Sequence, residues 1–174
     1  MKKTETRPYK VDSKQNLPVV NEPDAPFLLN EISVPNSWVI LNHATKKPES
    51  HLSSFEKIAM IKDGISKQDL EHLKTKADFD YNQLSRIFSV ARATLINKKG
   101  KEKFDMVISE KIVSVADIYS YGYEVFEDEA RFNNWIFRSN KALGGQSPYD
   151  MLDNQYGRDE VKNLIGRIDY GVHS

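Results

Sequence analysis

Residues 84–95 read LSRIFSVARATL, and this stretch decides the kind of fold that the sequence predicts. Leu84 and Phe88 are spaced to face inward from one helix, and Leu95 is spaced to face inward from a second helix. Val90 lies between the two helices, where an apolar side chain fills the corner that they form. Two short helices joined by such a turn are the layout of a helix-turn-helix unit.

The outward face of the second helix is polar and basic. Arginine and asparagine can make paired hydrogen bonds to guanine and adenine edges, and lysine suits phosphates. The residues expected to contact DNA are Arg92, Thr94, Asn97, Lys98 and Lys99. Ser89 and Ala91 stand where this motif usually has glycine and a capping serine or threonine, so the turn departs from the common pattern. A helical hairpin that only packs is the alternative.

Helix start signals surround this unit. Ser53, Ser66 and Asp80 are N-cap residues, and Ser53 and Asp80 each have a Glu or Gln three positions later. A longer amphipathic helix is expected from about residue 109 to 126. Three more helices follow, namely one through residues 130–136, one that opens at Pro148 and is stopped by Gly157, and one that ends near Gly171. The predicted fold is an all-α helical bundle.

The first 52 residues have a different texture. Six of the seven prolines lie within the first 48 residues, and each disfavours helix at its own position and at the one before. An irregular or disordered arm is therefore expected over residues 1–52, with the apolar run Trp38–Leu41 as a strand or an anchor. Residues 53–108 are expected to form a helix-turn-helix domain for DNA binding and dimerisation, and residues 109–174 a second helical domain.

The charges are unevenly distributed although the net charge is zero. Residues 86–103 carry six lysines and arginines against one glutamate, a net charge of +5. Residues 112–174 carry six basic against ten acidic residues, a net charge of −4. This asymmetry indicates either two different surfaces for two different partners or a solvated charged face, and charge alone does not decide between them.

Several classes of protein are disfavoured. The chain has no cysteine, which excludes disulfides and thiolate metal sites. No apolar run is long enough to span a membrane, and residues 1–5 are not apolar as in a secretory leader, so a cytoplasmic protein is expected. The four histidines have no metal-ligand spacing and no phosphate-binding glycine pattern occurs, so we expect no enzyme activity, metal or cofactor.

The C-terminal third resembles a known family. The block Asn140–Pro148, which reads NKALGGQSP, and the ending Arg167–Val172, which reads RIDYGV, are similar to the toxin-binding domain of Xre/MbcA/ParS antitoxins. The resemblance covers about residues 66–174, and it departs from the family at Ser139, where a proline is frequent.

The resemblance implies an antitoxin that forms a homodimer, binds operator DNA and neutralises a RES-domain toxin, a class similar to NAD-consuming ADP-ribosyltransferases. The chain end would block the NAD pocket of the toxin, and the residues so implied are Arg167, Ile168, Asp169, Tyr170, Gly171 and Val172. The alternative is a stand-alone transcription regulator whose acidic C-terminal domain senses a ligand or dimerises.

Overall fold

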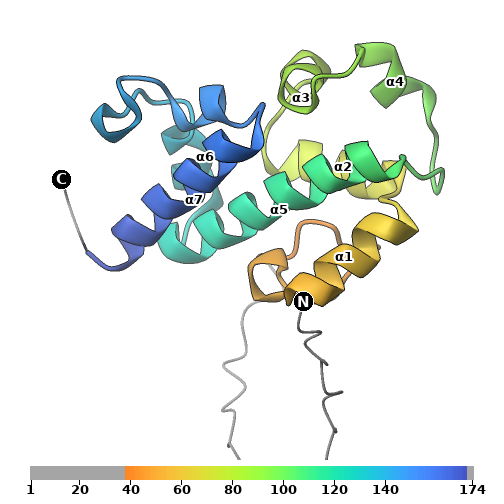
Figure 1. The fold of residues 1–174 in the computed structure, drawn as a ribbon, viewed down its shortest axis with the longest axis horizontal. Coiled ribbons are helices and arrows are strands. Elements are labelled where there is room, and N and C mark those ends of the chain that lie inside the picture. The colour runs from red at the N-terminus through yellow and green to blue at the C-terminus, as the bar shows by residue number, and fades with distance from the viewer. Residues whose placement is uncertain (1–37, 172–174) are drawn as a thin grey trace, which may run out of the picture. The chain divides into compact units, whose positions relative to one another are not determined.

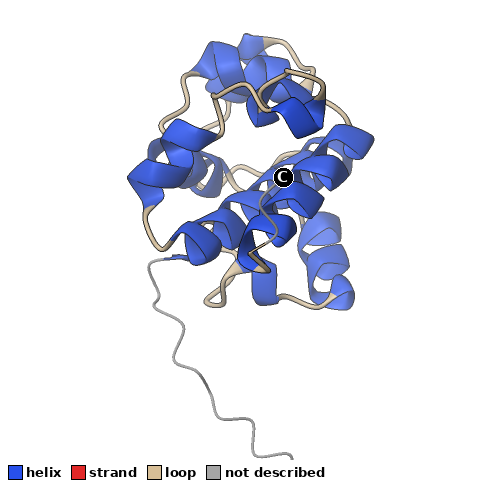
Figure 2. Ribbon diagram, turned by 90° about the vertical axis from the view of Figure 1, so that its left-hand side faces the viewer, coloured by secondary structure: helices blue, strands red, loops and turns tan. Residues whose placement is uncertain are grey.

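The structure is a computed structural model, and it describes residues 38–171. Most of the expected N-terminal arm, and Val172 of the expected toxin-binding set, lie outside this range. Within it the regular elements are helices, and pairing of the β type is limited to one isolated bridge between Ser66 and Lys103 (Figure 2). The all-α prediction is confirmed. None of the described helices is both long and apolar enough to cross a membrane.

The predicted helix starts are confirmed by their caps. The side chains of Ser53, Ser66 and Asp80 accept hydrogen bonds from backbone N–H groups three residues later. The elements in chain order are η2 (Glu49–His51), α1 (Ser54–Asp63), α2 (Lys67–Lys76), α3 (Tyr81–Phe88), α4 (Arg92–Asn97), α5 (Met106–Phe126), α6 (Glu129–Trp135), η3 (Lys141–Leu143), η4 (Pro148–Met151) and α7 (Gln155–Asp169).

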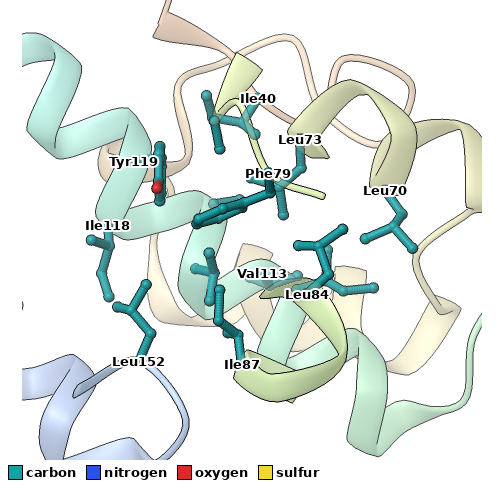
Figure 3. Packing of buried hydrophobic residues seen from close by; sticks show 14 of the residues in the cluster. Ile40, Leu70, Leu73, Phe79, Leu84, Ile87, Val113, Ile118, Tyr119 and Leu152 are labelled. Carbon is teal, nitrogen blue, oxygen red and sulfur yellow. The ribbon is translucent and has the colours of Figure 1, made fainter. Parts of the chain in front are cut away.

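Helix α5 is the centre of the fold and crosses the middle of the view in Figure 1. It contacts α1, α3, α6, α7 and η2. The buried side chains form one hydrophobic cluster, in which Ile40, Leu73 of α2, Leu84 of α3, Val113 of α5 and Leu152 all take part (Figure 3). The parts that we predicted as separate domains, residues 53–108 and 109–174, therefore share a core, and their separate functions stay a prediction.

Residues 38–52 lie on this core as an irregular segment. The side chain of Glu49 is fully buried, and its carboxylate accepts hydrogen bonds from the backbone N–H of Ile40 at 3.0 Å and of Leu41 at 2.6 Å. Burial raises the pKa of Glu49 to about 7, although these two backbone bonds act in the opposite direction. The apolar run is thus an anchor rather than a strand, and Glu49 fixes its backbone.

An interlocked group of aromatic rings holds α6 against α5. The ring of Phe132 is fully buried, and its centroid lies 5.2 Å from that of Tyr119 and 5.6 Å from that of Tyr123. Gly122 of α5 faces the same ring, and a Cβ at this position would lie 2.2 Å from Phe132 Cε2. The close contact of α5 and α6 therefore requires glycine here.

The prediction that Gly157 stops a helix is wrong. The turn that opens at Pro148 ends at Met151, and Gly157 lies inside the first turn of α7, where it is buried. A Cβ on Gly157 would lie 2.0 Å from the carbonyl oxygen of Met151. This glycine allows a close approach of two backbones, whereas Asn154 is the residue that begins α7.

Candidate functional site

The end of α7 places the residues of the predicted toxin-binding set that the structure describes. Arg167, Ile168 and Asp169 form the last turn of the helix, and Tyr170 and Gly171 follow it. The side chain of Tyr170 is 84 % exposed, whereas Ile168 is half-buried. The helix thus presents an aromatic side chain to solvent at its end.

This end is held in place by the rest of α7. Val161, Leu164 and Ile165 are buried in its inner face. Arg158 is 4 % exposed, and its guanidinium donates to Ser114 Oγ at 3.0 Å and to the carbonyl oxygen of Leu152 at 3.3 Å. Apolar packing and a satisfied buried cation therefore fix the helix along its length.

A groove of about 640 Å³ runs between α5 and the last turns of α7. The hydroxyl of Tyr121 donates to the Asp169 carboxylate at 3.2 Å on one side of it. Burial, followed by the charge of Asp169, raises the pKa of Tyr121 to about 12, so the hydroxyl keeps its proton. The groove is lined by Tyr121, Lys162, Asn163, Gly166, Arg167 and Tyr170.

Lys162 of α7 is half-buried and takes part in an ion pair with α5. Its ammonium lies 2.5 Å from the Asp117 carboxylate of α5, and Lys57 of α1 lies 2.8 Å from the other oxygen of that carboxylate. Asp117 is 8 % exposed, so the two ion pairs tie three helices together at one buried charge. Lys162 is therefore part of the support of α7.

The block Asn140–Pro148 forms the turn that precedes α7. The side chain of Asn140 accepts from the backbone N–H of Ala142 at 2.8 Å, and Gly144 and Gly145 have positive φ angles that favour glycine. Asp150 then pairs with Arg86 of α3 at 2.9 Å. This block thus builds a structured connection from α6 towards α7, and η4, which follows it, contacts α3 through Asp150.

The comparisons with known proteins agree with this geometry. Residues 122–171 match the family described as the antitoxin Xre/MbcA/ParS C-terminal toxin-binding domain, and this range covers α6, α7 and the turn between them. The C-terminal part of the chain is therefore similar to the toxin-binding domain of Xre-type antitoxins.

Three antitoxins are similar to a longer part of the chain. The antitoxin Xre of Photorhabdus laumondii is 26 % identical over 118 residues, which are 67 % of this chain and 80 % of the relative. The antitoxin Xre of Yersinia enterocolitica is 26 % identical over 66 % of this chain and 78 % of its own length. The Prs ADP-ribosylating antitoxin of a Sphingobium strain is 23 % identical over 69 % of this chain and 82 % of its own length.

The second predicted surface of the chain is α4, which packs on α3. Leu84, Phe88 and Leu95 are buried, as predicted for the pair. The turn between the helices contains Ser89 in the left-handed conformation with φ 51°, and the hydroxyl of Ser85 donates to the carbonyl of Val90 at 2.5 Å. Ser89 therefore adopts the conformation that glycine usually has in this turn. The hydrogen bond from Ser85 spans the corner between the two helices.

The predicted DNA-contacting residues lie on the solvent side of this pair. Arg92, Thr94, Asn97 and Lys99 are exposed. Lys98 is half-buried, and its ammonium lies over the ring of Phe104, 5.6 Å from the ring centroid. In Figure 1 α4 and the end of α7 lie on opposite sides of the molecule, so the two predicted sites are separate surfaces.

Sequence reasoning missed the partners of the α7 end. Tyr121 and Asn163 border the groove, but neither belongs to a motif that the sequence distinguishes from a solvated helix face. Within residues 38–171, no group of three or more His, Asp or Glu side chains is placed to hold a metal ion.

Proposed function

We propose that this antitoxin neutralises a RES-domain toxin by inserting the end of α7 into the NAD pocket of the toxin. The observation that carries the proposal is the exposed Tyr170 at the end of a helix whose other side is buried, inside the segment that matches a toxin-binding domain. Inhibitors that occupy a pocket concentrate their binding energy in a few inserted side chains, with aromatic residues and arginine favoured. Tyr170 and Arg167 are such residues, and both are exposed.

The class of toxin is inferred from two sources. The ending Arg167–Val172 resembles antitoxins that pair with RES-domain toxins. The Sphingobium relative carries ADP-ribosylation in its name, and RES toxins are similar to ADP-ribosyltransferases. We propose an NAD-consuming or ADP-ribosylating toxin as the partner on these grounds, with a homodimer of this chain in the complex.

Growth of cells that co-express the neighbouring toxin gene tests the mechanism. Tyr170→Ala should lose most of the protection, because the substitution removes an inserted ring and leaves α7 intact. Tyr156→Ala is the matched control, since Tyr156 is equally exposed at 84 % but lies at the other end of the same helix. Full protection by Tyr170→Ala would overturn the pocket-blocking mechanism, and equal loss in both variants would mean that the toxin binds along the whole helix.

A truncation adds a second test. Ending the chain after Asp169 keeps α7 complete, whereas ending it after Gly166 would also remove the last helical turn and the bond from Tyr121 to Asp169. The truncation after Asp169 is therefore the informative one, and it should abolish protection while the melting temperature is unchanged. A stand-alone regulator, the alternative function, would show no toxin-dependent phenotype in any of these strains.

We further propose that α4 binds operator DNA and so represses the operon. The supporting observation is the exposed strip of Arg92, Thr94 and Asn97 on a helix whose opposite side is fixed by Leu95. Arg92→Ala should weaken operator binding by about 1–3 kcal/mol and relax the preference at one base pair. Band-shift assays with the operator and a scrambled duplex measure both effects, and an unchanged operator affinity would remove Arg92 from the interface.

A further inference from the structure

A pocket of about 380 Å³ lies beside the first turn of α2, and its lining includes neither the residues of the groove at α7 nor the five residues predicted to contact DNA. Three segments that are distant in the sequence form its wall. They are the loop 43–46 ahead of α1, the end of α1 with the start of α2, and residues 101 and 103 after α4. The loop side is held by Asp69, whose Oδ1 accepts from the backbone N–H of His43 at 2.9 Å and of Ala44 at 3.3 Å.

The charges that line this pocket leave a positive surplus. Asp69 is 2 % exposed, and it also accepts from the hydroxyl of Ser66 at 2.6 Å, so its charge is already satisfied. Asp63 is paired with Lys103 at 2.6 Å. Among residues 38–171, Lys101 makes no ion pair within 4.0 Å, and Lys46 donates only to the carbonyl of Asn42, which leaves two of its N–H groups for a ligand. The pocket therefore suits an anion.

The first turn of α2 joins this pocket to α4. The ammonium of Lys67 donates to the carbonyl of Leu95 in α4 at 2.7 Å, and the backbone N–H of Lys67 donates to the carbonyl of Glu102 at 2.9 Å. The backbone N–H of Gln68, a residue of the pocket wall, donates to Gly100 at 2.9 Å. Two consecutive residues of α2 thus fix both the inner side of α4 and the segment that carries Lys101.

We propose that this pocket binds a backbone phosphate of the DNA that α4 contacts, through Lys46 and Lys101. The inference rests on the proposed DNA binding by α4. A helix in the major groove, which is about 12 Å wide, has a phosphate backbone on each side, and phosphate contacts set how the protein is oriented on the duplex. The proposal brings the loop ahead of α1 into the interface, although no motif in residues 42–47 indicated this. Because Asp69 anchors that loop, Lys46 is held in position before DNA binds.

The salt dependence of DNA binding tests the proposal. The full chain is titrated with a labelled duplex from upstream of its own gene, between 50 and 200 mM KCl. Each phosphate contact contributes about 0.9 to the slope of log affinity against log salt. Lys46→Ala and Lys101→Ala should each lower the slope by about one and weaken binding about eightfold at 100 mM salt. Lys47→Ala is the matched control, because Lys47 is the next residue of the loop, is paired with Glu56 and does not line the pocket.

Each outcome has a distinct meaning. If Lys46→Ala and Lys101→Ala leave the salt-dependence slope unchanged while the unmodified chain binds DNA tightly, the proposed phosphate site is overturned and DNA binding by α4 still stands. Equal losses of DNA affinity for Lys46→Ala and Lys47→Ala would mean that the lysines act by general charge attraction, and this result would also overturn the proposed phosphate site. An unmodified chain that binds no DNA would refute the proposed DNA binding by α4, and this inference with it, but would not bear on toxin neutralisation by the end of α7. Inorganic phosphate provides a separate arm: millimolar phosphate that shifts the Gln68 amide resonance, without any effect of the variants on DNA affinity, would make this a free-anion site.

Discussion

Replacing Gly122 with alanine has two opposing effects on the free energy of unfolding, namely a gain in helix propensity and a clash with the ring of Phe132. Alanine in the middle of a helix is favoured over glycine by about 1 kcal/mol. At this position, however, the new Cβ would lie 2.2, 2.3 and 2.6 Å from three carbons of the Phe132 ring, whereas non-bonded carbons prefer about 3.5–4.0 Å. The ring would have to move by about 1 Å or more.

Phe132 has no room for that movement. Its ring is fully buried, and Tyr119, Tyr123, Phe126 and Trp135 surround it with centroids 5.2–5.6 Å away. Overpacking of this kind costs about 3 kcal/mol, so the net loss in the free energy of unfolding is about 2 kcal/mol. For a chain of this length, the melting temperature should fall by about 4–8 °C.

Thermal unfolding followed by circular dichroism measures this effect, and α7 supplies the control. A Cβ on Gly166 would meet only the hydroxyl of Tyr121 at 3.5 Å, an ordinary contact. Gly166→Ala should therefore keep the gain in helix propensity and raise the melting temperature by about 2–4 °C. In a Phe132→Leu background, Gly122→Ala should lower the free energy of unfolding by less, because the ring that the new Cβ meets is absent. If both alanine variants raise the melting temperature, the close packing of α5 on α6 is refuted.

Three more predictions concern stability. The pKa of buried Glu49 is raised from 4.5 to about 7, so its contribution to stability is complete below about pH 4.5 and is lost as the pH rises through about 7. The loss is about 3 kcal/mol, and urea melts at pH 5 and pH 8 should show a drop that Glu49→Gln abolishes. Asp117→Asn leaves Lys162 and the lysine of α1 without their counter-charge and should cost about 2 kcal/mol by urea unfolding, more at low salt, whereas an exposed surface pair would cost nothing measurable. Gly157→Ala forces a Cβ to within 2.0 Å of the Met151 carbonyl and should lower the melting temperature at least as much as Gly122→Ala; an unchanged value would show that the two backbones separate at little cost.

The helix starts could be read from the sequence because a cap is a local signal. Ser53, Ser66 and Asp80 each act within three residues of themselves, so a sequence window contains both partners of the bond. Asp105 is the same kind of cap for α5. The predicted start of this helix, about Ser109, lies three residues after its observed start at Met106 because the prediction did not include this cap.

Contacts between distant segments were beyond the reach of such patterns. Gly157 has the same identity whether it ends a helix or admits a neighbouring backbone, and only the position of Met151 distinguishes the two. Lys162 lies at a polar position of α7, but Asp117 of α5, 45 residues earlier, decides its role. The predicted toxin-binding residues Arg167–Val172 came from a family resemblance, and the groove beside Arg167 and Tyr170 emerged only from the packing of α5 against α7.

The position of α5 at the centre of one shared core has a consequence for the lifetime of the protein in the cell. Because α1, α3, α6 and α7 all rest on it, loss of α5 removes the support of the α4 surface and of the α7 end in a single event. Hydrogen exchange should accordingly find one common opening free energy for the amides at the buried positions of α3, α5 and α7. The proposed toxin binding and the proposed operator binding would then be lost at one common rate, which is set by how often α5 opens to a protease, and not at two independent rates.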